Sequence, residues 1–494
     1  MKMAYNWKHQ AIQQMTVGAL LGILLGAMCL FLDPRLVAVS VVGIIGAIAL
    51  FRYPEAGILA IVLFLSSVLS ESSMPVINIG QLGLYITDAI AIWLFVILII
   101  RLLLDPSYKL QLNAVALPLL LFIGWVVISA VVHLIQNDLV LGNAIYEIRI
   151  ISYYLLFFVL INLIKTKQQV NRLLNGIFIL ATITSLANLT QYALGRDFTL
   201  LSGRVEAFSH ENTQMMNVTR ITDNPGEGLI TSAFIILTVK LFLSQFKFKN
   251  ILAFLQWVVI GGAFLVSFNR THWGVAAISI LITLFLIKPD ERKKMLTWLL
   301  YISWIIPLVL LPALIAPNSG YGQLINAALL RFSTLFTTDA YASATESTIV
   351  WRNFEYQYGI PQILKHPVLG VGPGANYRPF LENIDYPEFA GQRYSHNGHL
   401  WIAVKTGLPG WFFALSFLIT FIVQGFKNWR KILDVRFQSI YLGFTLVGLS
   451  VLLASILHPI IITIFWTPLL GISLGINPVL LKLYGSTPPE EVIT

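Results

Sequence analysis

Residues 114–135 read AVALPLLLFIGWVVISAVVHLI, which is 22 residues without an Asp, Glu, Lys or Arg. As an α-helix this stretch is about 33 Å long, enough to cross the ~30 Å hydrocarbon core of a bilayer. A helix also satisfies its own backbone hydrogen bonds, which lipid cannot do. The stretch therefore predicts a transmembrane helix.

Similar apolar runs recur along almost the whole chain. With 57% hydrophobic residues, 11% charged residues and a mean hydropathy of +0.78, the chain has too little polar surface for a soluble globule of 494 residues. We expect fourteen helices, with twelve or thirteen also open, at residues 15–32, 36–51, 56–69, 86–100, 114–135, 150–164, 173–194, 229–243, 251–268, 273–287, 296–315, 408–422, 440–457 and 460–481. The expected fold is all-α, a polytopic transmembrane helix bundle of about 12–14 helices forming one integral membrane domain over residues 1–494. The first run lacks a small-residue cleavage site, so we expect a retained helix rather than a signal peptide.

The charged residues predict the orientation of this bundle. Lys2 and Lys8 precede the first run, which places the N-terminus in the cytoplasm. Alternation then places the C-terminus and nearly all other lysines on the cytoplasmic side. The net charge of +9 is therefore explained by lysines on the cytoplasmic side of the membrane. It does not indicate a nucleic-acid partner, and none is expected. Cys29 is the only cysteine, which excludes an intrachain disulfide.

The external side is rich in arginine instead of lysine. Against Lys365 and Lys405, it carries Arg35, Arg149, Arg196, Arg204, Arg220, Arg270, Arg331, Arg352, Arg378 and Arg393. Planar, bidentate pairing with phosphate oxygens is what distinguishes a guanidinium from an ammonium. The alternative is that these arginines reach lipid headgroups or pair with nearby carboxylates, which are Glu206, Glu211, Glu346, Glu382 and Glu388.

Two expected external loops, residues 195–227 and 317–395, are longer than ordinary connections and are candidates for function. The second loop contains aromatic and aliphatic residues around 351–364, which predict a helix lying along the membrane surface. That helix should end at Lys365-His366-Pro367. We find no internal repeat, such as secondary transporters commonly show.

Four features on this side are candidates for chemistry. Arg270 lies in a polar knot between two runs, where a charge so close to hydrocarbon is costly unless paired; the alternative is a polar hairpin turn. Arg331 and Arg352 share the second loop. The glycines at 370, 372 and 374 allow tight turns that expose amides to an anion.

The fourth feature is His396-Asn397-Gly398-His399 at the end of the second loop. His396 is a candidate base or proton shuttle, because an imidazole titrates near working pH. A buried histidine that only holds the loop is the alternative. His396 and His399 have a spacing that suits a metal pair, but further ligands are not evident, so neither a metal nor another cofactor is expected.

These motifs together resemble the O-antigen ligase and polysaccharide polymerase superfamily, most clearly over about residues 229–425. Phe268-Asn269-Arg270, the stretch from Trp351-Arg352 to His366-Pro367-Val368-Leu369-Gly370-Val371-Gly372-Pro373-Gly374, Arg331 with Leu335, and His396-Asn397 with Gly407 carry the resemblance. It implies a GT-C-like fold in the bacterial cytoplasmic (inner) membrane. The proximal half of the chain shows no distinctive residues, and the family usually has about a dozen helices.

The resemblance further implies transfer of a glycan from an undecaprenyl-pyrophosphate carrier to an acceptor hydroxyl at the outer face, without a metal. We expect His396, Arg270 and Arg352 to be catalytic, and pyrophosphate contacts from Arg331, Arg393, Asn397, His399 and Gly372. The partners expected are the lipid-linked oligosaccharide, an acceptor glycan or lipid, and membrane lipid. The motifs do not separate a polymerase from a ligase or a protein glycosylator, and a polysaccharide transporter or lipid flippase is the alternative from another class.

Overall fold

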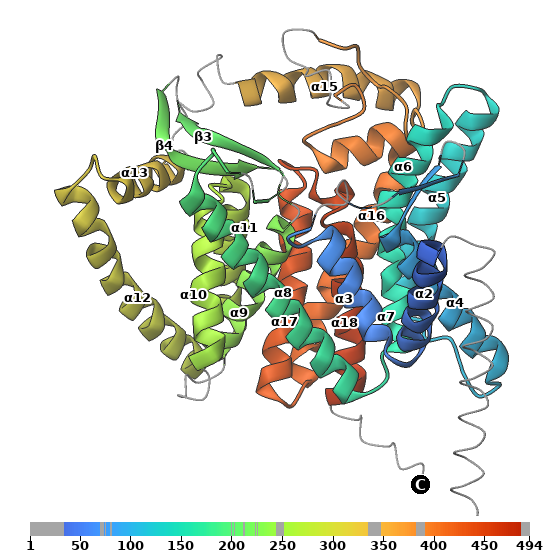
Figure 1. Cartoon of the computed structure of the whole chain (residues 1–494), viewed down its shortest axis with the longest axis horizontal. Helices are drawn as coiled ribbons and strands as arrows, with labels where there is room; N and C mark the ends of the chain where they lie inside the picture. The colour runs from blue at the N-terminus through green and yellow to red at the C-terminus, as the bar shows by residue number, and fades with distance from the viewer. Residues whose placement is uncertain are drawn as a thin grey trace, which may run out of the picture. The chain divides into compact units, whose positions relative to one another are not determined.

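The computed structural model describes residues 34–69, 74, 76–79, 82–198, 200–201, 203–210, 213–222, 224, 226–243, 251–333, 347–381 and 391–485 (Figure 1). The expected helix at 15–32, with Cys29, lies outside these residues. The chain divides into two compact units, Met1–Ala56 and Gly57–Thr494. The first unit contains helix α2 (Pro34–Arg52), and α3 (Pro54–Leu65) spans the boundary in sequence.

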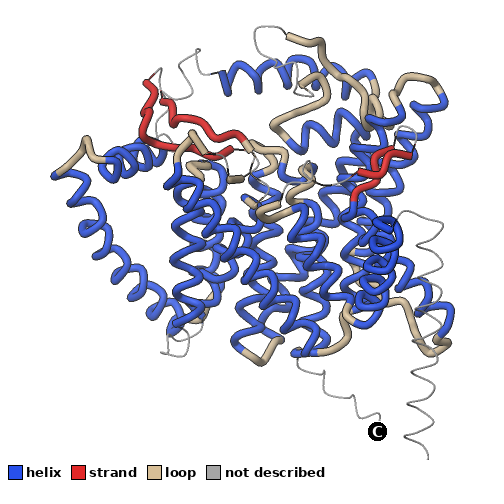
Figure 2. Tube along the Cα trace, viewed as in Figure 1, coloured by secondary structure: helices blue, strands red, loops and turns tan. Residues whose placement is uncertain are grey.

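The polytopic helical architecture is confirmed (Figure 2). Within the described residues, eight segments are long and apolar enough to cross a membrane, or nine if α2 and α3 form one broken span. They are α4 (Ile86–Leu104), α5 (Ala116–Ile135), α6 (Leu141–Ser152) continued through the 3₁₀ turn η2 (Tyr153–Leu155) into α7 (Leu156–Leu163), α8 (Lys167–Leu194), α12 (Pro289–Ile315), α16 (Gly398–Asn428) with the turn η4 (Trp429–Lys431), α17 (Val435–Ala454) and α18 (Thr467–Tyr484).

This number is lower than the expected twelve to fourteen, for a reason of length. Three further helices of the bundle have only 17, 16 and 17 residues: α9 (Glu227–Leu243), α10 (Ile251–Val266) and α11 (Arg270–Leu286). They nevertheless pack into the bundle, since α9 and α11 lie against α17, and α10 lies against α8 and α9. The expected span at 460–481 is also shorter, because the turn η5 (Ile460–Ile462) precedes α18.

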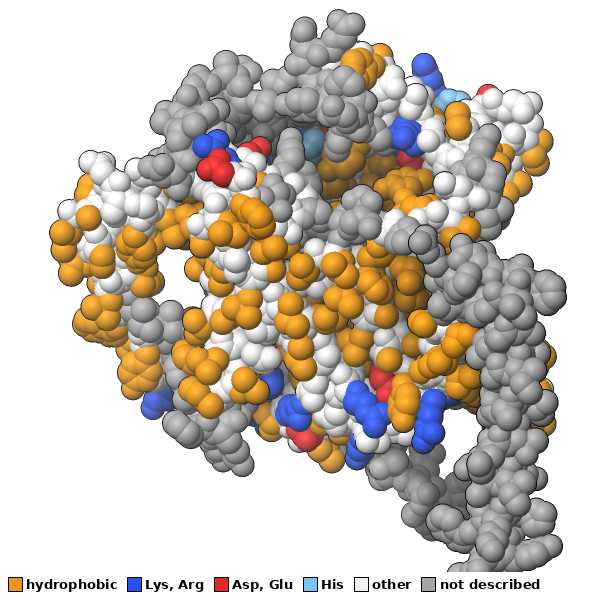
Figure 3. Space-filling view, in the orientation of Figure 1, with side chains coloured by type: hydrophobic (Ala, Val, Ile, Leu, Met, Phe, Trp, Pro, Cys, Tyr) orange, Lys and Arg blue, Asp and Glu red, His pale blue; other side chains and the backbone are white. Residues whose placement is uncertain are grey.

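Aromatic and aliphatic side chains fill the space between the helices. The ring of Phe417 on α16 lies 5.6 Å from that of Phe122 on α5 and 5.3 Å from that of Tyr154 on η2. All three side chains are buried. Outward-facing residues on the same helices are apolar as well (Figure 3), which is the surface a bilayer requires.

The two ends of the bundle differ in charge and in structure. The connections α4–α5, α7–α8, α11–α12 and α16–α17 meet at one end and contain Lys109, Lys165, Lys288 and Lys431. The opposite end contains α13 (Gly320–Ser333) and α15 (Ser347–Lys365), which lies across the top of the helices in Figure 1. The surface helix expected near 351–364 is therefore present.

The same end carries two β-hairpins that the sequence did not predict. Strand β1 (Val76–Ile79) pairs with β2 (Leu82–Tyr85), and β3 (Arg204–His210) pairs with β4 (Thr213–Thr222), both antiparallel. The second hairpin occupies most of the expected loop at 195–227. Across it, the guanidinium of Arg220 lies 3.4 Å from the carboxylate of Glu206, so this arginine forms an ion pair with a nearby carboxylate.

Candidate active site

Helix α16 is divided into two parts, and the first part presents His396. Gly407 interrupts it with φ 71°, so residues 398–406 form a separate short helix. Asn397 caps this short helix, because its side-chain Oδ1 accepts from the amide of Leu400 at 3.0 Å. The Asn397 amide group also donates to the hydroxyl of Tyr356 at 2.7 Å. His396, one residue before the cap, is fixed at the end of a helix.

The buried carboxylate of Glu355 on α15 holds His396. Glu355 Oε1 lies 2.6 Å from His396 Nδ1, and Oε2 accepts from the backbone amide of His396 at 2.8 Å and from the hydroxyl of Ser395 at 3.3 Å. Glu355 is 1% exposed, whereas the His396 side chain is 26% exposed. A carboxylate at Nδ1 fixes the tautomer and orientation of an imidazole, as in hydrolytic triads. We call these two residues the Glu355–His396 pair.

Arg352 lies one turn before Glu355 on the same helix. Its Nη2 donates to the backbone carbonyl of Leu457 at 3.1 Å, which ties α15 to the segment between α17 and α18. Within the described residues, its buried Nε has no hydrogen-bond partner. Arg352 therefore keeps donor capacity beside His458, the residue that follows Leu457.

A second polar group forms where α9 and α11 begin. Asn269 caps α11 through its Oδ1, and its amide donates to Glu227 Oε1 at 2.6 Å. Nδ1 of His272 lies 3.1 Å from the same oxygen. Arg270 is the first residue of α11, between Asn269 and His272 in sequence, and is partly exposed.

His458 joins this group to the Glu355–His396 pair. Its ring centroid lies 6.0 Å from that of His272. Burial lowers the pKa of His458 to about 4, opposed by the negative charge of Glu227, and the charges of His272, His396 and Arg352 also act on it. The structure thus places His396 and Arg352 near His458, and it places His272, two residues after Arg270, against the same imidazole.

The other expected site residues have different surroundings. His399 Nε2 lies 3.0 Å from the backbone carbonyl of Leu452 on α17. The amide of Gly372 donates to the backbone carbonyl of Lys405 at 3.0 Å and so does not offer itself to an anion. Arg331 is buried on α13, which packs against β4 and α12.

Arg393 lies near a buried ion pair that supports the short helix. Its charge acts on both Glu147 and Lys405, whose carboxylate and ammonium groups are 3.3 Å apart. Lys405 also donates to the carbonyl of Ala375, and Glu147 accepts from the amide of Gly374. The glycine-rich stretch is thereby clamped between α6 and α16.

Sequence reasoning missed Glu355, Glu227 and His458. Glu355 had a usable signal, because it follows Arg352 by three residues and therefore shares a helix face with it. Glu227 and His458 had none beyond being polar residues at the ends of apolar runs. Over the parts of the chain that the structure covers, no group of three His, Cys, Asp or Glu residues is arranged to hold a metal ion.

Comparison with known proteins identifies one matching family. The family described as O-antigen ligase matches residues 255–415, a range that includes Arg270, Arg352, Glu355 and His396. A comparison with curated proteins found no match. Glu227 and His458 lie outside the matched range. Residues 255–415 thus match the O-antigen ligase family, and this match supports the resemblance to the O-antigen ligase and polysaccharide polymerase superfamily.

Proposed function

We propose that this protein transfers a glycan from an undecaprenyl-pyrophosphate carrier to an acceptor hydroxyl, as a polymerase or ligase of a surface polysaccharide. The O-antigen ligase domain supports the broader part of this proposal, a role in surface polysaccharide assembly. The observation that carries the finer part is the Glu355–His396 pair beside Arg352.

The Glu355–His396 pair suits a general base. Glu355 accepts a hydrogen bond from Nδ1–H of His396, so Nε2 is the nitrogen that takes a proton from the attacking acceptor hydroxyl. The carboxylate then stabilises the imidazolium that forms. Glu355 is buried, so its charge acts on His396 with little screening by water.

Arg352 and Arg270 are suited to stabilise the pyrophosphate leaving group. As the bond between sugar and phosphate breaks, negative charge grows on the pyrophosphate, and fixed guanidinium groups stabilise it more in the transition state than in the ground state. Arg352 is held by the Leu457 carbonyl, and Arg270 by its position at the start of α11. Helix N-termini also favour anions. We assign Arg331 and Arg393 no contact with the reacting atoms.

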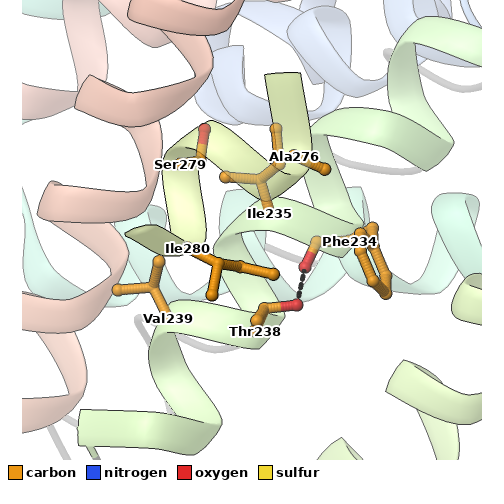
Figure 4. Close-up of a pocket in the computed structure, with 7 residues that line it drawn as sticks. All are labelled: Phe234, Ile235, Thr238, Val239, Ala276, Ser279 and Ile280. Carbon is orange, nitrogen blue, oxygen red and sulfur yellow. Dashed lines mark hydrogen bonds between the residues drawn. The ribbon is translucent and has the colours of Figure 1, made fainter. Parts of the chain in front are cut away.

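The same helices enclose a small apolar gap, which has no space for a polyprenyl tail. Residues of α9 and α11 line it, including Phe234, Thr238 and Ala276 (Figure 4). Phe234 follows Glu227 by seven residues and Ala276 follows Arg270 by six, so the pocket begins about 10 Å further along each helix.

The positive-inside rule supports an external active site in the bacterial inner membrane. Lysines occupy the connections at the end of the bundle opposite α15, and such an end faces the cytoplasm. The protein then binds polyprenyl-linked glycans at the outer face of the membrane.

Carrier release by purified protein tests the proposal. The protein in detergent is incubated with EDTA and a polyprenyl-pyrophosphate glycan with its acceptor, and free carrier pyrophosphate is quantified. We expect release by the wild type and a loss of about a hundredfold or more in Glu355→Gln and His396→Ala. Glu291→Gln is the matched control. It changes a carboxylate at the opposite end of the bundle and should remain active. Movement of intact lipid-linked glycan across vesicles without carrier release would instead favour a flippase.

A further inference from the structure

Two buried imidazole nitrogens near the proposed base have no hydrogen-bond partner among the described residues. One is Nε2 of His272, a side chain that is fully buried, and the other is Nδ1 of His458. Buried polar atoms are almost always hydrogen-bonded in folded proteins, because leaving one unpaired is costly. Two such atoms on neighbouring rings indicate a ligand that supplies the missing bonds.

These rings belong to a set we call the Glu227 cluster, which comprises Glu227, Asn269, His272 and His458. Its members come from the start of α9, the start of α11 and the segment between α17 and α18. The Glu227 side chain is 17% exposed and His458 is partly exposed, so the cluster is reachable. The surface is hollowed below α15 (Figure 3).

The hydrogen-bonding pattern of the cluster selects the kind of ligand. Nδ1 of His272 is directed at Glu227 Oε1, so Nε2 is the ring nitrogen that faces away from the carboxylate. A carboxylate has room for about four hydrogen bonds, and the two contacts from Asn269 and His272 both fall on Oε1. His458 is neutral at pH 7, since burial lowers its pKa to about 4.

A phosphate group is the wrong ligand for such a surface. It offers only acceptors and is repelled by the Glu227 carboxylate. A sugar hydroxyl donates one hydrogen bond and accepts others, so it matches a carboxylate beside imidazole nitrogens, whichever of these donate or accept. The ring of Trp466, 5.4 Å from that of His272, closes one side of the cluster.

We propose that the Glu227 cluster is a subsite that binds hydroxyl groups of a pyranose sugar next to the Glu355–His396 pair. Arg352 donates to the carbonyl of Leu457, the residue before His458, and this hydrogen bond places the subsite beside the reacting groups. This inference rests on the proposed function, since the sugar belongs either to the carrier-linked donor or to the acceptor. The arginines then hold pyrophosphate while the cluster orients the sugar.

Separate titration of the two substrates tests the subsite. Initial rates of carrier release are measured for the full-length wild type, Glu227→Gln and His458→Asn, with lipid-linked glycan and acceptor glycan extracted from the source bacterium. We expect KM for one of the two substrates to rise about tenfold or more, and kcat to fall by less than KM rises. A change in the donor KM assigns the subsite to the carrier-linked sugar, and a change in the acceptor KM assigns it to the acceptor.

The controls separate the possible failures. Glu291→Gln should leave both KM values unchanged. His458→Asn removes no side-chain hydrogen bond of the described residues, so it should fold even if Glu227→Gln does not. Folded, active variants with both KM values within twofold of the wild type would overturn the subsite. A wild-type protein that releases no carrier would overturn the proposed function instead.

Discussion

Arg352 is held in position by one hydrogen bond and has a further donor, Nε, without a hydrogen-bond partner among the described residues. The Leu457 carbonyl takes one hydrogen from Nη2, and the buried Nε has no partner within the described residues. Arginine is suited to this arrangement, because its planar fork can bind the protein backbone and a pyrophosphate oxygen together. A lysine in its place supplies charge without that geometry.

Arg352→Lys is therefore expected to lower kcat/KM by about tenfold to a hundredfold, and Arg352→Ala by more than about a hundredfold. Rates of carrier release by purified variants measure the effect. Arg220→Lys, in the β3–β4 hairpin, keeps a cation opposite Glu206 and should stay within twofold of the wild type. Equal activity of Arg352→Lys and the wild type would show that charge alone suffices at this position.

His458 links stability to pH. Its pKa is about 4 in the folded protein, mainly because of burial, against about 6.5 for an exposed histidine. Between these values the unfolded chain binds more protons than the folded one, so stability falls as pH drops from 6.5 towards 4. The full difference of about 2.5 pKa units corresponds to about 3 kcal/mol.

Thermal unfolding of the detergent-solubilised protein at pH 7.0, 6.0 and 5.0 measures this dependence. We expect the unfolding temperature to fall over this range, and to fall less in His458→Asn, which has no group to protonate there. Parallel pH profiles for the two proteins would show that other groups cause the acid sensitivity. Glu227, His272 and His396 lie in the same region and are present in both proteins, so the comparison isolates His458.

At the scale of elements, the break in α16 is what places the Glu355–His396 pair. Gly407 has φ 71°, and a Cβ there would lie 2.3 Å from the carbonyl oxygen of Val368. The backbone amides of Val371 and Leu408 complete hydrogen bonds between the glycine-rich stretch and the two parts of α16. The buried Glu147–Lys405 pair strengthens the same junction.

Gly407→Ala should therefore destabilise the protein and displace the short helix that carries His396. We expect a lower unfolding temperature and a loss of carrier release of at least about tenfold. Gly274→Ala is the matched control, because no atom lies within 4 Å of its added Cβ and alanine favours a helix. If Gly407→Ala has the unfolding temperature and the carrier release of the wild type, the break in α16 is not needed to position His396.

At the scale of the whole molecule, the arrangement of charges predicts the topology. The α15 end should face outward and the lysine-rich end the cytoplasm. Cys29→Ser removes the only cysteine, after which Asn353→Cys and Lys431→Cys place single exposed thiols at opposite ends. An impermeant maleimide should label Asn353→Cys in intact spheroplasts and Lys431→Cys only after lysis. The reverse pattern would place the site in the cytoplasm.

Much of this architecture was predictable because it depends on local sequence. Runs of apolar residues predicted the helices of the bundle, and the aromatic residues near 351–364 predicted the surface helix α15. The β-hairpins were missed, since short strands such as β3 have no apolar run to mark them. Each expected run within the described residues coincides with a helix, but α9, α10 and α11 are too short to count as full-length spans.

The amino-acid sequence by itself determined that this is a helical membrane protein, and it nominated Arg270, Arg352 and His396. Only the tertiary structure decided which groups they meet: Glu355 lies 41 residues before His396, and Glu227 and His272 meet His458 from other helices. The physical reason is that hydrophobicity and helix length are encoded locally, whereas a buried carboxylate finds its partner through the packing of helices distant in the chain.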